Sequence, residues 1–151
     1  MYHYYMFHKP FGCVSARRDE RYPTVMDYFK ELHNENLYPV GRMDRETTGL
    51  LLITDDGVFN QKLTHPDFHK EKTYEFTVLG DLTPDLVHKL ETGVMLKGAD
   101  TLTAPAKIAI TGHAVMADIL STLPEEIQRD IHKNRPEHPV TYGTITICEG
   151  K

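Results

Sequence analysis

One segment of this sequence combines residues that could do chemistry: GRMDRETTG, residues 41–49, with a single aspartate, Asp44. Arg42 and Arg45 flank that carboxylate, and nearby positive charge favours its ionised form. An ionised carboxylate can act as a nucleophile or stabilise charge electrostatically. The segment is longer than the usual connection of roughly 4–6 residues, and glycine at each end permits unusual backbone conformations. From these residues alone, a catalytic loop and an ordinary solvated loop both remain open.

Histidine and cysteine give no comparable pattern. His65 and His69 are four residues apart, a spacing that can place two metal ligands on one face of a helix. Pro66 argues against a continuous helix there, and no third ligand is placed to complete a site, so we predict no metal. Cys13 and Cys148 have neither metal nor redox spacing, which indicates small buried residues in a reduced protein without a disulfide framework.

The elements that must position the loop follow from apolar periodicity. Residues 3–8 predict a first strand, and helical spacing of apolar residues predicts a helix at 24–33. The loop then lies between a strand near 37–41 and the apolar run 50–53, which is typical of a buried strand. A helix at 57–64 follows. We therefore expect the aspartate to be held between two strands.

A strand at 71–79 alternates between an apolar and a polar face. Lys72 and Tyr74 belong to the apolar face near the start of this strand, where a pocket could open. The Thr-Pro pair at 83–84 predicts the start of a helix, and Gly93 predicts its end.

Alternating apolar residues in the last third of the chain predict strands at 104–110 and 145–147. Between them an acidic segment at about 113–141 has an apolar stripe at helical spacing, and residues 122–125 have the spacing of a capping box, so we predict two successive helices. Together the elements predict an α+β fold with a mixed, mainly antiparallel sheet and flanking helices. We find no repeat or linker and expect one domain, residues 1–151.

Composition is that of a soluble globular protein, with 151 residues, 40% hydrophobic and 26% charged. No apolar stretch approaches the roughly 18 residues of a membrane span, and the N-terminus lacks a secretory pattern, so we expect a cytoplasmic protein. The net charge of −5 weighs against nucleic acid as a partner. Lys9, Arg17, Arg18 and Arg21 nevertheless lie close together near the start of the chain.

Four motifs, in order and spacing, resemble those of one enzyme family. GRMDRETTGLLLITDDG at 41–57 is similar to the signature of the pseudouridine synthases that modify small- and large-subunit ribosomal RNA. HKPFG at 8–12, LTHP at 63–66 and EKTYE at 71–75 agree with the same family. The resemblance covers residues from about 4 to 110 and resumes at about 142–151.

The resemblance implies isomerisation of a specific uridine in ribosomal RNA to pseudouridine, with Asp44 as the nucleophile, a flipped-out base and no metal or organic cofactor. Tyr74 matches the active-site tyrosine of the family, which lies against the target base. The implied partner is ribosomal RNA or a ribosomal-subunit precursor, without DNA or a membrane, and we expect a monomer. The expected substrate-binding residues are Arg42, Thr47, Lys72, Lys9, Arg17 and Arg18.

Several of these side chains have an alternative role. Arg42 could pair with Asp44 or grip a phosphate. For Thr47 and Thr48 we expect the side chains to hold the loop through hydrogen bonds to the backbone. Lys72 could reach phosphate or merely extend its ammonium group to solvent.

The sequence departs from the family pattern in two places. The catalytic pattern begins within the first ten residues, so we expect the small N-terminal RNA-binding domain of many relatives to be missing. The chain ends at CEGK, residues 148–151, where the family continues with a basic motif that supplies a partner for the aspartate. We therefore expect a truncated, partial catalytic domain that is weakly active or inactive alone. The alternative function is a catalytically impaired RNA-binding module of the same fold. The acidic insertion at 113–141 is also unusual for the family.

Overall fold

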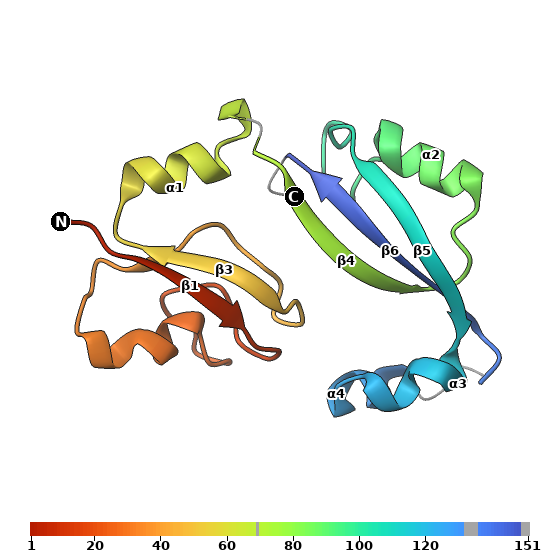
Figure 1. Cartoon of the computed structure of the whole chain (residues 1–151), viewed down its shortest axis with the longest axis horizontal. Coiled ribbons are helices and arrows are strands. Elements are labelled where there is room, and N and C mark those ends of the chain that lie inside the picture. The colour runs from red at the N-terminus through yellow and green to blue at the C-terminus, as the bar shows by residue number, and fades with distance from the viewer. Residues whose placement is uncertain (69, 132–135, 149–151) are drawn as a thin grey trace. The chain divides into compact units, whose positions relative to one another are not determined.

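The computed structural model describes residues 1–68, 70–131 and 136–148. These residues group into two compact units, the first ending at Lys70 and the second beginning at Glu71 (Figure 1). Each unit contains a three-stranded sheet, in the order β1-β3-β2 in the first and β4-β6-β5 in the second. Every pairing between these strands is antiparallel, and helices flank both sheets, which confirms the predicted α+β class.

The first unit consists of β1 (Tyr4–Lys9), the 3-10 helix η1 (Val25–Leu32), β2 (Tyr38–Pro39), β3 (Gly49–Thr54), α1 (Gly57–Thr64) and the 3-10 helix η2 (Pro66–Phe68). The helix predicted at 24–33 is present, although it has the tighter 3-10 geometry. The strand predicted at 37–41 is only two residues long. Pro39 has no N–H to donate to a neighbouring strand, and Gly41 has a φ of 81°, so regular pairing ends there.

The sheet of the first unit builds its core on one face. Pairing of β1 with β3 runs from Tyr4 opposite Thr54 to Lys9 opposite Gly49. Alternate side chains of both strands therefore point to the same side. The buried core residues are Cys13, Val25, Leu37, Leu51 and Ile53, and the rings of Tyr5, Phe7 and Phe29 pack against them.

The apolar run 50–53 is buried only in alternation. Leu51 and Ile53 are 3% and 0% exposed, whereas Leu50 is 68% exposed. The prediction of a buried strand was therefore wrong for Leu50, because an antiparallel strand turns successive side chains to opposite faces. At the end of this strand Asp56 accepts hydrogen bonds from the N–H groups of Val58 and Phe59 and so begins α1 as its N-cap.

The second unit consists of β4 (Lys72–Leu79), α2 (Pro84–Thr92), β5 (Lys107–Val115), α3 (Met116–Ile119), the 3-10 helix η3 (Leu120–Thr122), α4 (Glu125–Ile131) and β6 (Pro139–Ile147). Strand β6 lies at the centre and pairs along most of its length with β4 and β5. Strand β4 alternates as predicted, with half-buried and exposed residues in strict succession. Helix α2 begins and ends as predicted, since Thr83 caps it and Gly93 follows it.

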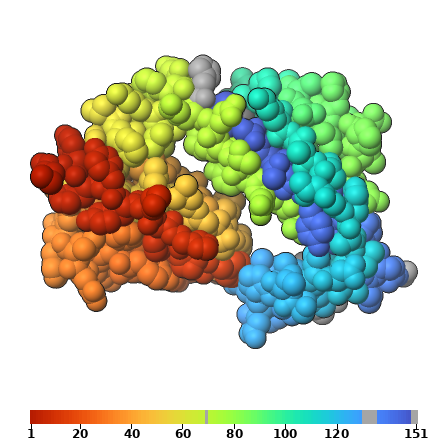
Figure 2. Space-filling view, in the orientation of Figure 1, coloured from red at the N-terminus to blue at the C-terminus, as the bar shows by residue number. Residues whose placement is uncertain are grey.

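The acidic segment is less helical than the prediction for 113–141. Strand β5 runs on to Val115 through an irregularity between Ile110 and Gly112, and β6 already begins at Pro139. Both predicted strands were therefore too short: the one at 104–110 begins and ends too early, and the one at 145–147 begins too late. Two α-helices, α3 and α4, do follow one another between these strands. In the space-filling view, the light-blue residues of this segment gather at one end of the second unit (Figure 2).

The hydroxyl of Thr122 does not cap the second of these helices. It donates to the carbonyl of Ile119 at 2.6 Å and so completes the preceding turn. Met116 and Ile119, with Val140 of β6, form a small core of their own at the base of the helices.

Candidate active site

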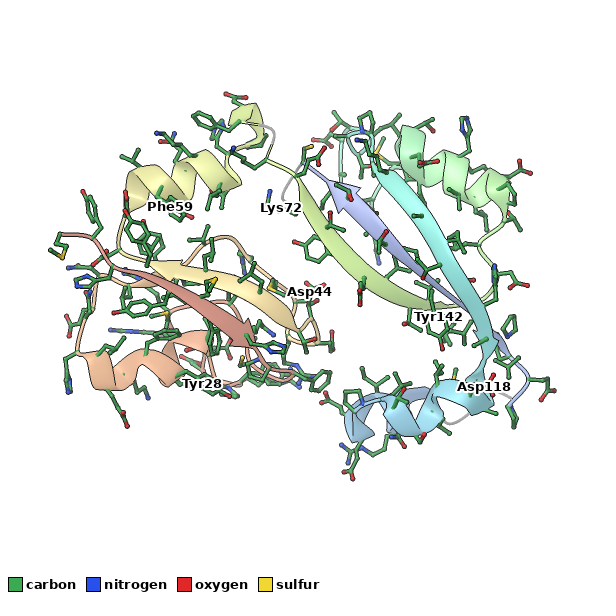
Figure 3. The ribbon with its side chains drawn as sticks, in the orientation of Figure 1. Tyr28, Asp44, Phe59, Lys72, Asp118 and Tyr142 are labelled. Atoms are coloured by element: carbon green, nitrogen blue, oxygen red, sulfur yellow. The ribbon has the colours of Figure 1, made fainter. Side chains whose placement is uncertain are left out.

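Asp44 lies on the loop that leads into β3, and its side chain is exposed (Figure 3). Gly41 and Gly49 bound this loop with φ angles of 81° and 116°, which glycine adopts without steric penalty. The N–H of Thr47 donates to the carbonyl of Asp44 at 3.0 Å and closes a turn. The Asp44 carboxylate accepts no hydrogen bond from any residue that the structure describes. Its oxygens are therefore available to a ligand.

Lys9 supports this loop from inside the protein, and its predicted contact with phosphate was wrong. The side chain is fully buried, at 0% exposure. Its ammonium group donates to the backbone carbonyls of Pro10 and Arg45 at 3.1 Å each and of Thr47 at 2.7 Å. Burial lowers the pKa of Lys9, and the negative charge of Asp44 opposes that shift. A buried cation thus links the end of β1 to the aspartate loop.

The guanidinium group of Arg45 packs against two aromatic rings. Its guanidinium carbon lies 4.7 Å from the ring centre of Tyr22 and 5.5 Å from that of Phe11. It also pairs with Glu46 at 3.6 Å. The side chain is only 18% exposed, so these cation–π contacts are partly shielded from water. The carbonyl of Arg45 accepts a further bond from the N–H of Gly12 at 2.9 Å.

The predicted partners of Asp44 contribute less than expected. The exposed side chain of Arg42 makes no ion pair with Asp44 in the described part of the chain. The hydroxyl groups of Thr47 and Thr48 make no hydrogen bond to the described residues, so the expectation that these side chains hold the loop was wrong. The loop is held instead through its backbone, because the carbonyls of Arg45 and Thr47 accept hydrogen bonds from the ammonium group of Lys9.

Ser15 is a residue of this region that the sequence analysis did not identify. Its hydroxyl accepts from the N–H of Met43 at 3.1 Å and donates to the carbonyl of Met43 at 3.2 Å. The side chain is 8% exposed. A serine after the apolar pair Cys13-Val14 is a weak signal, because its partner lies 28 residues away.

A closed loop with several arginines follows Ser15. The N–H of Val14 donates to the carbonyl of Pro23, and the carbonyl of Val14 accepts from the N–H of Val25, both at 2.9 Å. These hydrogen bonds hold the two ends of the segment 15–22 close together. Within this loop Arg17 lies over the ring of Tyr38 at 5.6 Å, and Arg21 lies over Tyr22 at 5.2 Å.

Arg18 is exposed and has no ion pair among residues 1–68, 70–131 and 136–148. The loop thus offers cationic groups on a fixed base, as the predicted phosphate contacts of Arg17 and Arg18 require.

Lys72 and Tyr74 lie in the second unit, on the same face near the start of β4, and both are half-buried. Figure 3 labels Lys72 at the start of this strand. Their partners across the sheet are Ile147 and Ile145 of β6. Asp44, Arg42 and Thr47 belong to the first unit. The face predicted for Lys72 and Tyr74 from alternation is confirmed.

Metal-binding groups are absent from the described residues, where no three His, Cys, Asp or Glu side chains cluster. The ring Nδ1 of His65 accepts from the N–H of Asp67 at 3.2 Å. His69, the other histidine of the weighed pair, lies outside the described residues, as do residues 149–151 of the predicted C-terminal departure. Cys13 is buried and Cys148 half-buried. None of the described helices has the length and apolar character to cross a membrane.

Comparison with known proteins gives a consistent result. A family model described as RNA pseudouridylate synthase matches residues 3–145. A ribosomal small subunit pseudouridine synthase A of Pseudomonas aeruginosa is 39% identical over 109 residues, which cover 72% of this chain and 47% of that protein. A ribosomal large subunit pseudouridine synthase B of Bacillus subtilis is 38% identical over 133 residues, covering 87% and 51%.

The crystal structure of a pseudouridylate synthase superimposes with a TM-score of 0.73 and 30% identity, covering all of this chain and 53% of that one. The chain spans about half the length of the curated relatives it matches.

Proposed function

The chain belongs to the RNA pseudouridylate synthase family, and from that membership we propose that it converts a specific uridine of ribosomal RNA to pseudouridine, with Asp44 as the nucleophile. The relatives named above carry both small-subunit and large-subunit names, so the proposal extends to ribosomal RNA and not to one subunit. The observation that carries it is the exposed carboxylate of Asp44 on a backbone that buried polar groups hold from both sides.

The reaction is an isomerisation. The bond between C1′ of the ribose and N1 of the base breaks, a bond between C1′ and C5 forms, C5 loses its hydrogen to solvent and N1 takes up a proton. Atoms and electrons balance without an oxidant or reductant, and we propose, as the family resemblance implies, that the reaction uses no metal or organic cofactor. The carboxylate attacks either the base or C1′, and both routes need it ionised and within contact of a uridine.

The target uridine must leave its stack to reach a side chain on a loop. Extrusion of a nucleotide costs a few kcal/mol, which contacts to the base and the flanking backbone must offset. We assign Tyr74 to the face of the base and to removal of the C5 proton. The contacts to phosphate come from Arg42, Lys72, Arg17 and Arg18. Thr47 lines the rim of the substrate site beside Asp44. Lys9 is not assigned to the substrate-binding residues, because its ammonium group is buried.

Further parts of the proposal concern the setting of the reaction. The protein acts as a monomer in the cytoplasm, on ribosomal RNA or on a ribosomal-subunit precursor. A basic loop at residues 15–22 supports such a partner in a chain whose net charge is −5, because phosphate contacts need only local positive charge.

Tritium release tests the proposal directly. Ribosomal RNA transcribed with uridine labelled at C5 is incubated with the unaltered chain, with Asp44→Asn and with Asp100→Asn. Asp100 is an exposed aspartate of the second unit without a hydrogen bond or ion pair among the described residues, so it controls for the loss of one charge. We expect Asp44→Asn to reduce release at least about a thousandfold, because removal of a nucleophile has effects of that order. Asp100→Asn should release tritium at the unaltered rate.

The same assay can contradict the proposal. Release that persists in Asp44→Asn would remove Asp44 as the nucleophile. Binding of ribosomal RNA by the unaltered, folded chain without any release would favour the RNA-binding module instead.

A further inference from the structure

The two residues beside Asp44 in the chain are both fixed by polar contacts. On one side, Met43 exchanges two hydrogen bonds with the hydroxyl of Ser15, at 3.1 and 3.2 Å. On the other, the carbonyl of Arg45 accepts from the N–H of Gly12 at 2.9 Å and from the ammonium group of Lys9 at 3.1 Å. Asp44 itself is exposed. The structure therefore fixes the backbone around the carboxylate and leaves the carboxylate open.

Ser15 suits this task by its chemistry and by its place in the fold. A hydroxyl group carries one donor and two acceptor lone pairs, so one side chain can satisfy both the N–H and the carbonyl of Met43. Ser15 is 8% exposed, and water competes little for these bonds. Its neighbour Val14 is bonded to both Pro23 and Val25. The two hydrogen bonds between Ser15 and Met43, called the clamp below, therefore start from a backbone that is itself held by hydrogen bonds.

We propose that Ser15 is a positioning residue for Asp44. Its hydroxyl fixes the backbone of Met43 and so directs the carboxylate of Asp44 toward the target uridine. The inference rests on the proposed function, since it assigns the purpose of the clamp to that reaction. Once the backbone is fixed on both sides, the carboxylate has only a few staggered orientations left. Loss of the hydroxyl should leave Asp44 present but badly aimed.

Kinetics of three variants separate aim from mere stability. We expect Ser15→Ala to lower kcat about 10- to 100-fold, because a small misplacement of a reacting group has effects of that size. KM should stay within about threefold, since contacts to RNA elsewhere are intact. Ser15→Thr, which restores a hydroxyl, should recover most of kcat. Ser121→Ala controls for the loss of a hydroxyl, because Ser121 is exposed and its side chain makes no hydrogen bond in the described part of the chain.

Amide hydrogen exchange of the full chain gives a second readout that does not depend on activity. In Ser15→Ala the amide of Met43 should exchange at least about tenfold faster, because its acceptor is gone, whereas α2 should exchange as before. Unchanged exchange at Met43, or faster exchange without a fall in kcat, would overturn the positioning role. If the unaltered chain binds ribosomal RNA without activity, the RNA-binding module replaces the proposed function for this chain. The exchange result then decides by itself whether Ser15 holds the loop.

Discussion

The aspartate loop of the first unit and strand β4 of the second hold their candidate residues by different means. Around Asp44 the contacts run from the buried side chains of Lys9 and Ser15 to backbone atoms of the loop. Tyr74 owes its position to the repeated pairing of β4 with β6, where it stands opposite Ile145. A few polar atoms hold the loop of Asp44 in place, whereas many equivalent backbone hydrogen bonds hold strand β4. Single polar substitutions should therefore disturb the loop far more than the strand.

The largest effect in this comparison is expected for Lys9→Met. Removal of the ammonium group takes one donor from each of the carbonyls of Pro10, Arg45 and Thr47. The carbonyl of Arg45 keeps the N–H of Gly12 as a donor, and that of Pro10 keeps the thiol of Cys13. A buried polar group that loses its partner costs about 1–3 kcal/mol, and because three carbonyls each lose a donor we expect the free energy of unfolding to fall by about 3 kcal/mol or more. Urea unfolding followed by far-ultraviolet circular dichroism measures it.

Lys107→Met is the matched control in the second unit. Lys107 is 82% exposed on β5 and pairs with Glu71 at 3.8 Å on the surface. Exposed ion pairs contribute roughly 0–1 kcal/mol, so this variant should unfold almost as the unaltered protein does. Equal losses from both lysines would contradict the difference that we draw between loop and strand.

A smaller effect is expected where the strand itself is sensitive, at Gly143 of β6. A Cβ at this position would meet the carbonyl oxygen of Ala109 and the ring of Phe76, each at 2.6 Å. Overpacking of this kind costs about 1–3 kcal/mol, which we expect for Gly143→Ala in the same unfolding experiment. Gly112→Ala is the control, since its Cβ would make only an ordinary contact with Tyr142 at 3.5 Å. A larger loss at Gly112 would show that the register of this sheet is wrong.

The smallest effect is expected from a fall in pH, which tests the hydrogen bonds of Asp55 in the first unit. Hydrogen bonds from the backbone N–H and the ring of His3 hold the pKa of Asp55 well below its ordinary value. Because the folded state lowers this pKa, the resulting stability is present above the unfolded value of about 3.9 and is lost as the pH falls below it. Unfolding free energies between about pH 5 and 2 should therefore fall more steeply for the unaltered chain than for Asp55→Asn. Parallel curves would contradict this role of Asp55.

The strand with Tyr74 could be predicted from the sequence, and the support of Asp44 could not. Alternation along 71–79 assigns Lys72 and Tyr74 to one face because a strand has a fixed period of two. The caps of α2 were equally predictable from Thr83 and Gly93, which act within a few residues.

Lys9 was misjudged because nothing local distinguishes a buried lysine from a solvated one. Two of its three acceptors lie 36 and 38 residues further along the chain. The bounds of the acidic segment failed for a related reason. Gly112 interrupts the apolar alternation of β5, and only pairing with β6 keeps the strand extended to Val115.

The carbonyl contacts of Lys9 also constrain the order of folding. Lys9 is the last residue of β1 and stands opposite Gly49, so the pairing of β1 with β3 brings its ammonium group to the carbonyls of Arg45 and Thr47. Closing a loop of this length carries an entropic penalty that local structure cannot offset in advance. During synthesis the support that Lys9 gives to the Asp44 loop therefore cannot form before residues 45–47 have been added to the chain.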